Sequence, residues 1–595
     1  SDSKTPDIQP SSTPRRVSKN RFERLYPQKA FDGGFKITSV TNTDGSKLSH
    51  TINSTMMRIN LPKPLASGEK FEFNISWWYN INNHRTQGGR SGYEHFTENG
   101  NNNYVIAQFY PRMCVYDNVE GWQNDQFWGR SEFALEFGDF KVNITVPADH
   151  MLNATGKLLN ENEVFSKKEL KRLNIAKKTF DKPVIIRSQK EAEKIEKKKS
   201  KKTKTWKFDA KNVRDYAFAT SRKFIFDGMA VDINGRTVMA YSLYSKEANP
   251  LYGDHSTRAT AQTLITYSKY TFDYPYHKAV SVDGQMGMEY PMMAFNPGRP
   301  NPDGTYSDRT KYRMIKVTVH EVGHNWFPMI VNSDERQWTW MDEGLNSYLE
   351  ILAELEYDKN FPISRGLPKN IVRYMSGDQS RLAPIMSKGD HTYSFGNNAY
   401  GKPATALWIL RETIMGKELF DHAFKTYAQR WKFKHPTPAD FFRTMEDASA
   451  MDLDWFWRGW FYTTDVTDIG IKSVKKFQAV EGTNNSVKFV EDAKGSKKVN
   501  NKFYYDVTYE KPGGLVMPII IEMTYKDGTK SRKKYPAQIW RLNDKQITKS
   551  IESDKEIVSI VVDPDLETAD VDVTNNSWPK KQDNKFGKFK KKIKG

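Results

Sequence analysis

The motif His-Glu-Val-Gly-His at residues 320–324 constrains this 595-residue chain more than any other stretch. Residues four apart lie on one face of a helix, so His320 and His324 can offer two imidazole nitrogens to one metal ion, with Glu321 beside them. Apolar residues around the motif recur at helical spacing: Ile315, Val319, Val322 and Trp326. The segment is therefore predicted to be an amphipathic helix that carries metal ligands on one side.

A third potential ligand, Glu343, follows after an eighteen-residue gap, at the start of a second helical pattern. A lone HExxH sequence on a helix is more often a solvated face, but Glu343 at this spacing favours a metal site. Two imidazoles and one carboxylate leave the fourth position of a tetrahedral zinc ion open, as in catalytic sites. Water bound there has a pKa of about 7, and Glu321 is placed to accept its proton. The pattern predicts one zinc ion per chain and hydrolytic chemistry.

Two further motifs flank this zinc motif in a fixed order. Gly287-Met288-Glu289-Tyr290-Pro291 precedes it by about thirty residues, and Tyr400-Gly401-Lys402 begins 57 residues after Glu343. In this order and spacing they resemble the G-x-M-E-N and Y-x-K-G motifs of the aminopeptidase N family of zinc metallopeptidases. These are gluzincins, and the family includes the leukotriene epoxide hydrolases. The resemblance extends from about Arg21 to about Val466.

The resemblance implies roles for individual residues. In the family the motif glutamate, here Glu289, binds the free α-ammonium of the substrate, and the strand that carries Gly287 and Met288 pairs with the peptide backbone. The motif tyrosine donates a hydrogen bond to the oxyanion of the tetrahedral intermediate. Tyr400 takes this place, and Tyr393 is the nearby alternative. The implied function is a zinc-dependent aminopeptidase that removes N-terminal residues from peptides with a free N-terminus.

The chain departs from the family pattern at several positions. Met286, Tyr290 and Pro403 replace the first glycine and the asparagine of one motif and the final glycine of the other. The family's amino-terminal domain also contributes Gln or Glu to the amine pocket. Here Gln108 supplies the amide, but Tyr110 stands where the acid is expected. The enzyme is then less selective for substrates with a free amino terminus, or Gln108 and Tyr110 together take the place of the missing acid in the amine pocket.

Glu350, seven residues beyond Glu343, is predicted to orient a zinc-ligating histidine by a hydrogen bond without binding the metal itself, and Asp342 is the competing candidate. Two other functions are alternatives to the aminopeptidase. A gluzincin endopeptidase would not need Glu289, and a catalytically silent peptide-binding homologue would have lost a ligand or the base. Nothing in the chain selects an epoxide hydrolase activity.

The expected fold class is multidomain α+β. An N-terminal antiparallel β domain, truncated at its start relative to the family, precedes a thermolysin-like catalytic domain with the zinc helix and a C-terminal β-sandwich. The large helical domain of long family members has no room here, so the cleft is expected to be more open. The expected boundaries are as follows: 1–20, a disordered lead; 21–235, the β domain with a basic insertion at 187–204 that is solvated and either helical or disordered; 236–466, the catalytic domain; 467–575, the sandwich; 576–595, a basic disordered tail.

The net charge of +19 does not predict nucleic-acid binding, because thirteen of these charges lie in residues 187–204 and 580–594. Such segments are solvated, and the tail can contact anionic surfaces peripherally. The longest apolar runs, such as 515–521, are too short to span a bilayer, so no transmembrane segment is expected. A single cysteine excludes an internal disulfide. We expect a monomer, and an extracytoplasmic location (periplasmic or secreted) rather than a cytoplasmic one.

Overall fold

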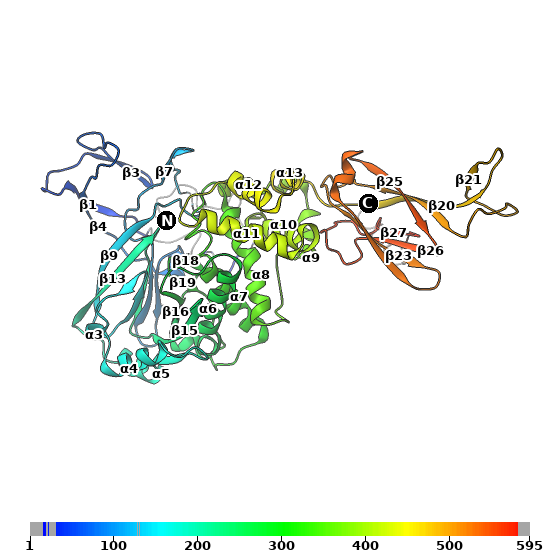
Figure 1. The fold of residues 1–595 in the computed structure, drawn as a ribbon. Helices are drawn as coiled ribbons and strands as arrows, with labels where there is room; N and C mark the ends of the chain where they lie inside the picture. Colours follow the sequence, from blue (N-terminus) through cyan, green and yellow to red (C-terminus); the bar gives the residue numbers. More distant parts are fainter. Residues whose placement is uncertain (1–15, 20–21, 23–30, 128, 130, 581–595) are drawn as a thin grey trace. The chain divides into compact units, whose positions relative to one another are not determined.

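The computed structural model describes residues 16–19, 22, 31–127, 129 and 131–580 (Figure 1). Most of the expected disordered lead at 1–20 and of the expected basic tail at 576–595 lies outside these residues. The chain forms two compact units. The first comprises residues 1–362, 388–390 and 424–441, and the second comprises residues 363–387, 391–423 and 442–595. None of the described helices is long and apolar enough to cross a membrane.

The first unit opens with antiparallel β-structure, as the alternation of polar and apolar residues predicts. Strand β9 (Gly138–Pro147), for example, alternates half-buried and exposed residues over its first six positions. One sheet has the order β10-β14-β6-β5, another has the order β11-β13-β9, and three pairs of strands are smaller. The bounds of the remaining strands are β1 (Lys36–Asn42), β2 (His50–Asn53), β3 (Met56–Ile59), β4 (Phe73–Trp78), β5 (Gly92–Phe96), β6 (Asn101–Ile106), β7 (Tyr116–Asp117), β8 (Gly121–Trp122), β10 (Met151–Ala154), β11 (Lys157–Leu158), β13 (Thr203–Val213) and β14 (Phe218–Ser221).

A six-stranded mixed sheet forms the base of the catalytic region. Its order is β12 (Val184–Arg187), β15 (Ile225–Ile233), β16 (Arg236–Tyr244), β17 (Lys278–Asp283), β19 (Met293–Asn296) and β18 (Met288–Tyr290). The domain boundary expected between residues 235 and 236 falls in the tight turn that joins β15 to β16. Asn234 and Gly235 both have positive φ there, as such hairpin turns require. The sheet therefore continues across that boundary, because the two strands pair along their whole length.

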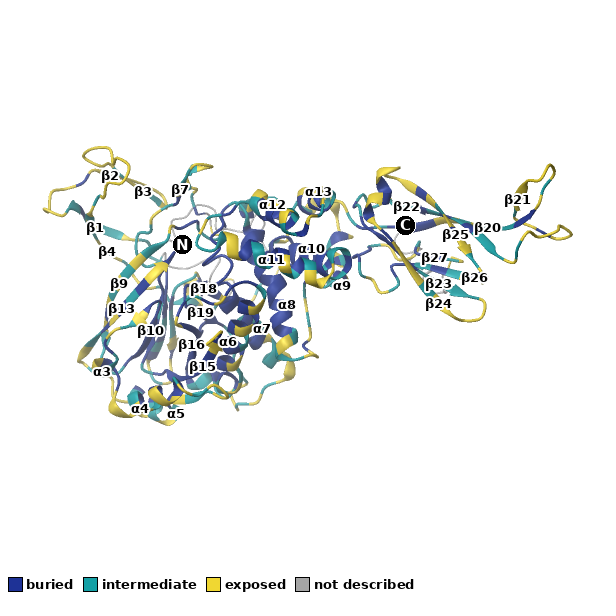
Figure 2. Cartoon of the chain, in the orientation of Figure 1, coloured by how far each residue is buried: buried dark blue, intermediate teal, exposed yellow. Residues whose placement is uncertain are grey.

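Helices α6 (Leu251–Tyr270) and α7 (Asp308–Gly323) pack on this sheet, and α8 (Leu345–Tyr357) packs against both of them. Helix α7 begins at Ser307, whose hydroxyl accepts a hydrogen bond from the backbone N–H of Thr310 (3.2 Å). Its predicted apolar face is buried, and most residues of α8 are buried as well (Figure 2). Parts of α11 (Lys417–Trp431) and α12 (Pro438–Ser449) also belong to this unit. Its other helical elements are short: α2 (His84–Gln87), α3 (Glu161–Val164), α4 (Lys167–Ala176), α5 (Gln189–Glu196), the 3₁₀ turns Lys246–Ala248 and Gly389–His391, and the π-helical turn Trp340–Gly344.

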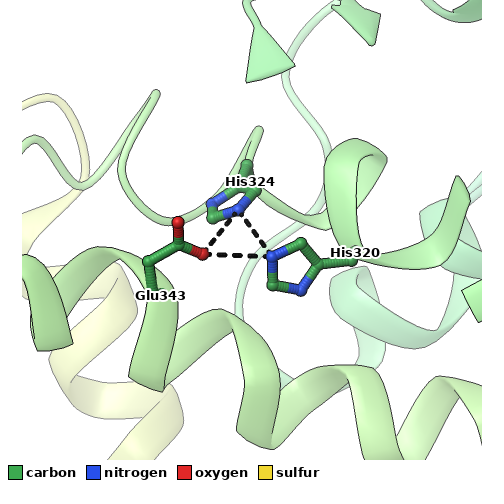
Figure 3. A group of neighbouring side chains, drawn as sticks. All are labelled: His320, His324 and Glu343. Carbon is green, nitrogen blue, oxygen red and sulfur yellow. Dashed lines mark hydrogen bonds and ion pairs between the residues drawn. The ribbon is translucent and has the colours of Figure 1, made fainter. Parts of the chain in front are cut away.

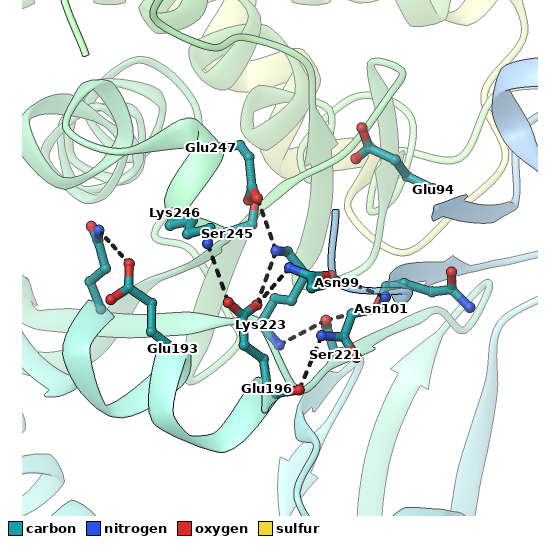
Figure 4. Close-up of polar contacts among 12 residues, drawn as sticks. Glu94, Asn99, Asn101, Glu193, Glu196, Ser221, Lys223, Ser245, Lys246 and Glu247 are labelled. Atoms are coloured by element: carbon teal, nitrogen blue, oxygen red, sulfur yellow. Dashed lines mark hydrogen bonds and ion pairs between the residues drawn. The ribbon is translucent and has the colours of Figure 1, made fainter. Parts of the chain in front are cut away.

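The basic segment 187–204 is helical in part, which is one of the two expected forms, and most of its lysines are exposed. It contains α5, which begins with a capping box between Ser188 and Glu191. At its end Glu196 is buried and accepts hydrogen bonds from Lys223 Nζ (3.0 Å) and Lys246 Nζ (3.3 Å) (Figure 4). Arg187 is also buried and pairs with Glu169 (2.7 Å). The charge composition did not indicate these buried ion pairs, because their partners lie outside the segment.

The second unit contains helices followed by two four-stranded antiparallel sheets. The sheets have the orders β21-β20-β22-β25 and β24-β23-β26-β27, and Tyr505 Oη of one accepts from the backbone N–H of Ile557 in the other (2.8 Å). The α+β fold class with a C-terminal β-sandwich is thus confirmed. The bounds are α9 (Pro368–Met375), α10 (Lys402–Ile409), α13 (Asp454–Tyr462), the π-helical segments Gly396–Gly401 and Leu410–Met415, the 3₁₀ turns Gln379–Arg381 and Ala537–Arg541, β20 (Gly470–Glu481), β21 (Val487–Val490), β22 (Phe503–Glu510), β23 (Ile519–Tyr525), β24 (Lys530–Tyr535), β25 (Gln546–Ser553), β26 (Ile557–Val562) and β27 (Ser577–Trp578).

Candidate active site

Helix α7 and the turn before α8 bring the three predicted zinc ligands together (Figure 3). His320 Nε2 lies 3.1 Å from His324 Nε2 and 3.1 Å from Glu343 Oε2, and His324 Nε2 lies 3.3 Å from the same oxygen. All three side chains are buried. Three ligand atoms from two elements thus converge on one point.

The size of this triangle fits a zinc ion. Ligand atoms about 2.0–2.1 Å from a tetrahedral metal lie about 3.3–3.4 Å from one another, close to the separations seen here. Two imidazole nitrogens and one carboxylate oxygen are also the donor set of a catalytic zinc site with an open fourth position. The residues therefore fit the metal that the motif predicts, in number, chemistry and spacing.

The other ring nitrogen of each histidine faces an acceptor. His320 Nδ1 lies 2.7 Å from Glu350 Oε2, while His324 Nδ1 lies 2.9 Å from both the Phe327 carbonyl oxygen and Asp342 Oδ1. An acceptor at Nδ1 keeps the proton there and leaves Nε2 free to bind a metal. The structure thus places both competing candidates, Glu350 and Asp342, each beside a different histidine.

Glu321 projects from α7 beside the ligands, and the backbone of Gly287 presses against it. A Cβ atom added to Gly287 would lie only 2.4 Å from Glu321 Oε1, so the glycine leaves room for the carboxylate. Glu289 lies close enough to interact directly with Glu321, and both side chains are buried. Two carboxylates therefore share one buried space beside the predicted zinc position.

Burial has the largest effect on the pKa of both carboxylates, Glu289 and Glu321. Burial and then the nearby carboxylates, chiefly Glu132, raise the pKa of Glu289 to about 7. Burial and the neighbouring Glu289 raise the pKa of Glu321 well above its usual range. A cation near either carboxylate would oppose these shifts, because it favours the ionised form.

Strand β18, which holds Met288 and Glu289, is the edge strand of the six-stranded sheet and pairs only with β19 among the described strands. An edge strand can accept an extended peptide as an additional strand. Gln108, with φ +51°, donates from Nε2 to Tyr290 Oη (3.2 Å), so it lies beside the residue that replaces the family's asparagine. Tyr110 does not join it, because its hydroxyl donates to Asp215 Oδ1 (2.9 Å).

Tyr400 and Tyr393 belong to the second unit. Tyr400 lies on the π-helical turn Gly396–Gly401, where the guanidinium of Arg365 stands over its ring at 4.8 Å. Tyr393 is exposed. The role of either tyrosine as an oxyanion donor stays a prediction.

Sequence reasoning missed a group of charged residues beside Glu289. Glu132 and Glu335 each bring a carboxylate oxygen within 4.8 Å of a Glu289 oxygen, and Arg90 and Arg214 pair with them. Glu132 and Glu335 stand in no motif, and Glu132 is 157 positions from Glu289. No periodicity in the chain could have indicated this cluster.

The structure brings together a helix with two predicted zinc ligands, a distal glutamate and a glutamate on an edge strand, the arrangement that the resemblance to gluzincins implies. Residues 256–460 match the model of the Peptidase family M1 domain. Leucine aminopeptidase 2 of Emericella nidulans is 30% identical over 192 residues, covering 30% of this chain and 30% of that protein. Glutamyl aminopeptidase of Sus scrofa is 26% identical over 185 residues, covering 29% and 20%. The match thus spans less than a third of either relative.

Solved structures share the fold. A mutant M1 zinc metallopeptidase from Deinococcus radiodurans superposes with a TM-score of 0.50 at 15% identity, covering 73% of this chain and 85% of that one. Aminopeptidase A of Legionella pneumophila, in complex with aspartic acid, gives a TM-score of 0.56 at 11% identity, covering 91% and 55%. Residues 256–460 thus match a Peptidase family M1 domain, and the chain shares the fold of M1 zinc metallopeptidases.

Proposed function

We propose that this protein is a zinc-dependent aminopeptidase that removes N-terminal residues from peptides. The observation that carries the proposal is the position of Glu289: a buried carboxylate on an edge strand, next to Glu321 and the three predicted zinc ligands. A catalytic base alone would suit any metallopeptidase. A second buried carboxylate beside it favours a substrate that brings its own positive charge.

His320, His324 and Glu343 would hold the zinc ion, one per chain. When bound, zinc acts as a Lewis acid that lowers the pKa of a water ligand to about 7 and polarises the scissile carbonyl. Glu350 and Asp342 keep the two imidazoles oriented through their Nδ1 atoms.

The other residues of the site act on the substrate. Glu321 accepts the proton of the attacking water and returns it to the leaving amine, as a general base and then a general acid. Strand β18 aligns the peptide, while Glu289 holds its α-ammonium, so that cleavage falls after the first residue. Met288 and Gly287 form the strand segment that the peptide meets, and Gln108 orients Tyr290 beside it. Tyr400 as the oxyanion donor, a monomeric state and an extracytoplasmic location stay predictions from the sequence.

The test compares peptides that differ only in the charge of the amino terminus. Aminoacyl-fluorophore substrates and their N-acetylated versions are assayed with and without a zinc chelator. We expect hydrolysis of the free amines alone, lost with the chelator and restored by zinc. Glu289→Gln should lower kcat/KM for the free amines and reduce the difference between the two substrate types. Glu136→Gln, which neutralises a half-exposed carboxylate elsewhere in the same unit, is the matched control.

Equal cleavage of free and acetylated substrates by the unaltered protein would contradict the proposal. It would indicate an endopeptidase that uses the same zinc site. Binding of peptides without any turnover in the zinc-loaded protein would indicate a silent peptide-binding homologue instead.

A further inference from the structure

Two rows of side chains face each other between the helices that carry the candidate zinc site. Lys316 and His320 lie four residues apart on α7, and Glu350 and Glu354 lie four residues apart on α8, so each pair shares one face of its helix. The two helices pack against each other. A carboxylate of the second row can therefore contact the lysine and the histidine of the first row at once.

Glu350 makes these two contacts with different oxygens. Its Oε2 atom lies 2.7 Å from His320 Nδ1, and its Oε1 atom lies 2.5 Å from Lys316 Nζ. The same ammonium group lies 3.3 Å from Glu354 Oε1. Lys316, Glu350 and His320 thus form a continuous chain of contacts that ends at a predicted zinc ligand.

This chain of contacts is largely shielded from solvent. The side chains of Glu350 and Glu354 are 0% exposed, and that of Lys316 is 18% exposed. Opposite charges attract strongly in such surroundings, and a buried carboxylate that loses its cation is costly. The ammonium group of Lys316 therefore stabilises the Glu350 carboxylate in its position between the two helices.

Glu354 does not compete for the charge of Lys316. Burial and then the negative charge of Glu350 raise the pKa of Glu354 well above its usual range, so its carboxyl group keeps its proton near neutral pH. One positive charge thus faces one negative charge, and the ammonium group serves Glu350.

We propose that Lys316 is a positioning residue of the zinc site, which holds the Glu350 carboxylate in the orientation that fixes the imidazole of His320 and so raises the zinc affinity. The inference rests on the proposed function, because it takes His320 as a zinc ligand. Lys316 lies outside the HExxH motif, one helical turn before His320. It touches neither the metal position nor the substrate, and it acts through Glu350 alone.

The physical reason is the rotational freedom of a glutamate carboxylate. Its last torsion has a broad energy minimum, so one hydrogen bond leaves the plane of the carboxylate free to turn. A second partner on the other oxygen removes this freedom, and the acceptor that faces His320 Nδ1 is then preorganised. His324 depends less on such support, because the Phe327 carbonyl oxygen also lies 2.9 Å from its Nδ1.

The test measures zinc affinity directly, without an activity assay. The zinc Kd of the full chain is determined by competition with a fluorescent chelator for the unaltered protein and for Lys316→Met, Lys316→Gln, Lys316→Arg, Glu350→Met and the double variant Lys316→Met/Glu350→Met. Lys311→Met is the matched control, because Lys311 lies on the same helix and its ammonium group stands over the Tyr312 ring. The melting temperature of each zinc-free protein is recorded.

We expect Lys316→Met to raise the zinc Kd by about 3- to 30-fold. The direction is diagnostic, because simple repulsion between a lysine and a nearby metal ion predicts the opposite, a lower Kd when the lysine is removed. Lys316→Gln should show a similar loss, and it decides the question if Lys316→Met does not fold. Lys316→Arg keeps the charge and the donors, so its Kd should stay within about twofold of the unaltered protein, as should that of Lys311→Met.

The double variant tests whether Lys316 acts through Glu350. Once the carboxylate is gone, Lys316→Met should not weaken zinc binding further, so the double variant should bind zinc no more weakly than Glu350→Met. A residue that stabilised the site by packing alone would cause the same loss with or without Glu350.

An unchanged or lower zinc Kd in Lys316→Met and Lys316→Gln would overturn the inference. So would the same loss in the Glu350→Met background, or a loss that Lys316→Arg does not restore. If the unaltered protein binds zinc and removes N-terminal residues while the Lys316 variants keep its Kd, only the present inference fails. If the unaltered protein binds zinc but cleaves no peptide with a free amine, the proposed function fails, and the Kd values still decide the role of Lys316.

Discussion

The two histidines that are predicted to bind zinc are held unequally, and this predicts unequal effects of mutation on zinc affinity. His320 Nδ1 lies 2.7 Å from Glu350 Oε2 and 3.2 Å from the Asn346 amide nitrogen, which is a donor. His324 Nδ1 faces both the Phe327 carbonyl oxygen and Asp342 Oδ1, each at 2.9 Å. Glu350→Met should therefore disturb zinc binding more than Asp342→Asn does, because His324 keeps its backbone acceptor.

The expected change in the zinc Kd follows from the hydrogen bond that each mutation removes. A buried hydrogen bond to a carboxylate at 2.7 Å contributes about 1.5–3 kcal/mol, so Glu350→Met should raise the zinc Kd by about 10- to 100-fold. Asp342→Asn should raise it by less than about tenfold, because one acceptor remains. Glu354→Gln is the matched control. Glu354 is as buried as Glu350, contacts Lys316 (3.3 Å) and lies beside Glu350, but it is not one of the three predicted zinc ligands, so it tests the loss of a buried carboxyl group next to the orienting carboxylate.

The assay is competition for zinc between each protein and a fluorescent chelator, with metal content and the melting temperature of the zinc-free proteins measured in parallel. We expect Glu354→Gln to leave the zinc Kd unchanged. A Kd for Glu350→Met equal to that of the unaltered protein would refute the reasoning. So would a larger effect of Asp342→Asn than of Glu350→Met at equal melting temperature.

Four further predictions address catalysis and stability. Glu321→Gln should keep one zinc per chain by metal analysis and lower kcat by about 10²–10⁴, as for loss of a general base. Gly287→Ala should displace the Glu321 carboxylate, which a Cβ would approach to 2.4 Å, and so lower kcat with little change in melting temperature. Tyr400→Phe should lower kcat by about 10²–10³ with substrate binding intact, and the two tyrosines must be exchanged if Tyr393→Phe shows that loss instead. Burial lowers the pKa of Lys278 to about 7, so the folded state holds fewer protons than the unfolded state between pH 7 and about 10.5. In denaturant unfolding, the unaltered protein should then gain about 1 kcal/mol of stability per pH unit across this window relative to Lys278→Met, and a constant difference would contradict the shift.

The local parts of the site could be predicted because they depend on local spacing. His320 and His324 are four residues apart on one helix, and Glu350 lies seven residues beyond Glu343, so helical periodicity alone places each pair on one face. The alternation of polar and apolar residues likewise predicted the antiparallel strands and the C-terminal sandwich, since side chains of a strand point to opposite faces in turn.

The continuous catalytic sheet could not be predicted in this way. Strands β15 and β16 are joined by a two-residue turn and pair fully, so the expected break at 235/236 does not exist as a structural boundary. A change of composition along the chain says nothing about which strands share hydrogen bonds. Within the basic segment 187–204, the burial of Glu196 could not be predicted either, because it depends on Lys223 and Lys246, which lie in turns outside the segment.

The amino-acid sequence by itself was enough to predict the zinc ligands, the base and the M1 peptidase domain, because short-range spacing and motif order carry that information. Only the tertiary structure decided which acids surround Glu289. Glu132 and Glu335 approach it from distant segments, and Tyr110 turns away to Asp215. The physical reason is that charge pairing in a buried space is set by three-dimensional distance and by the cost of an unpaired charge, and neither follows a period along the chain.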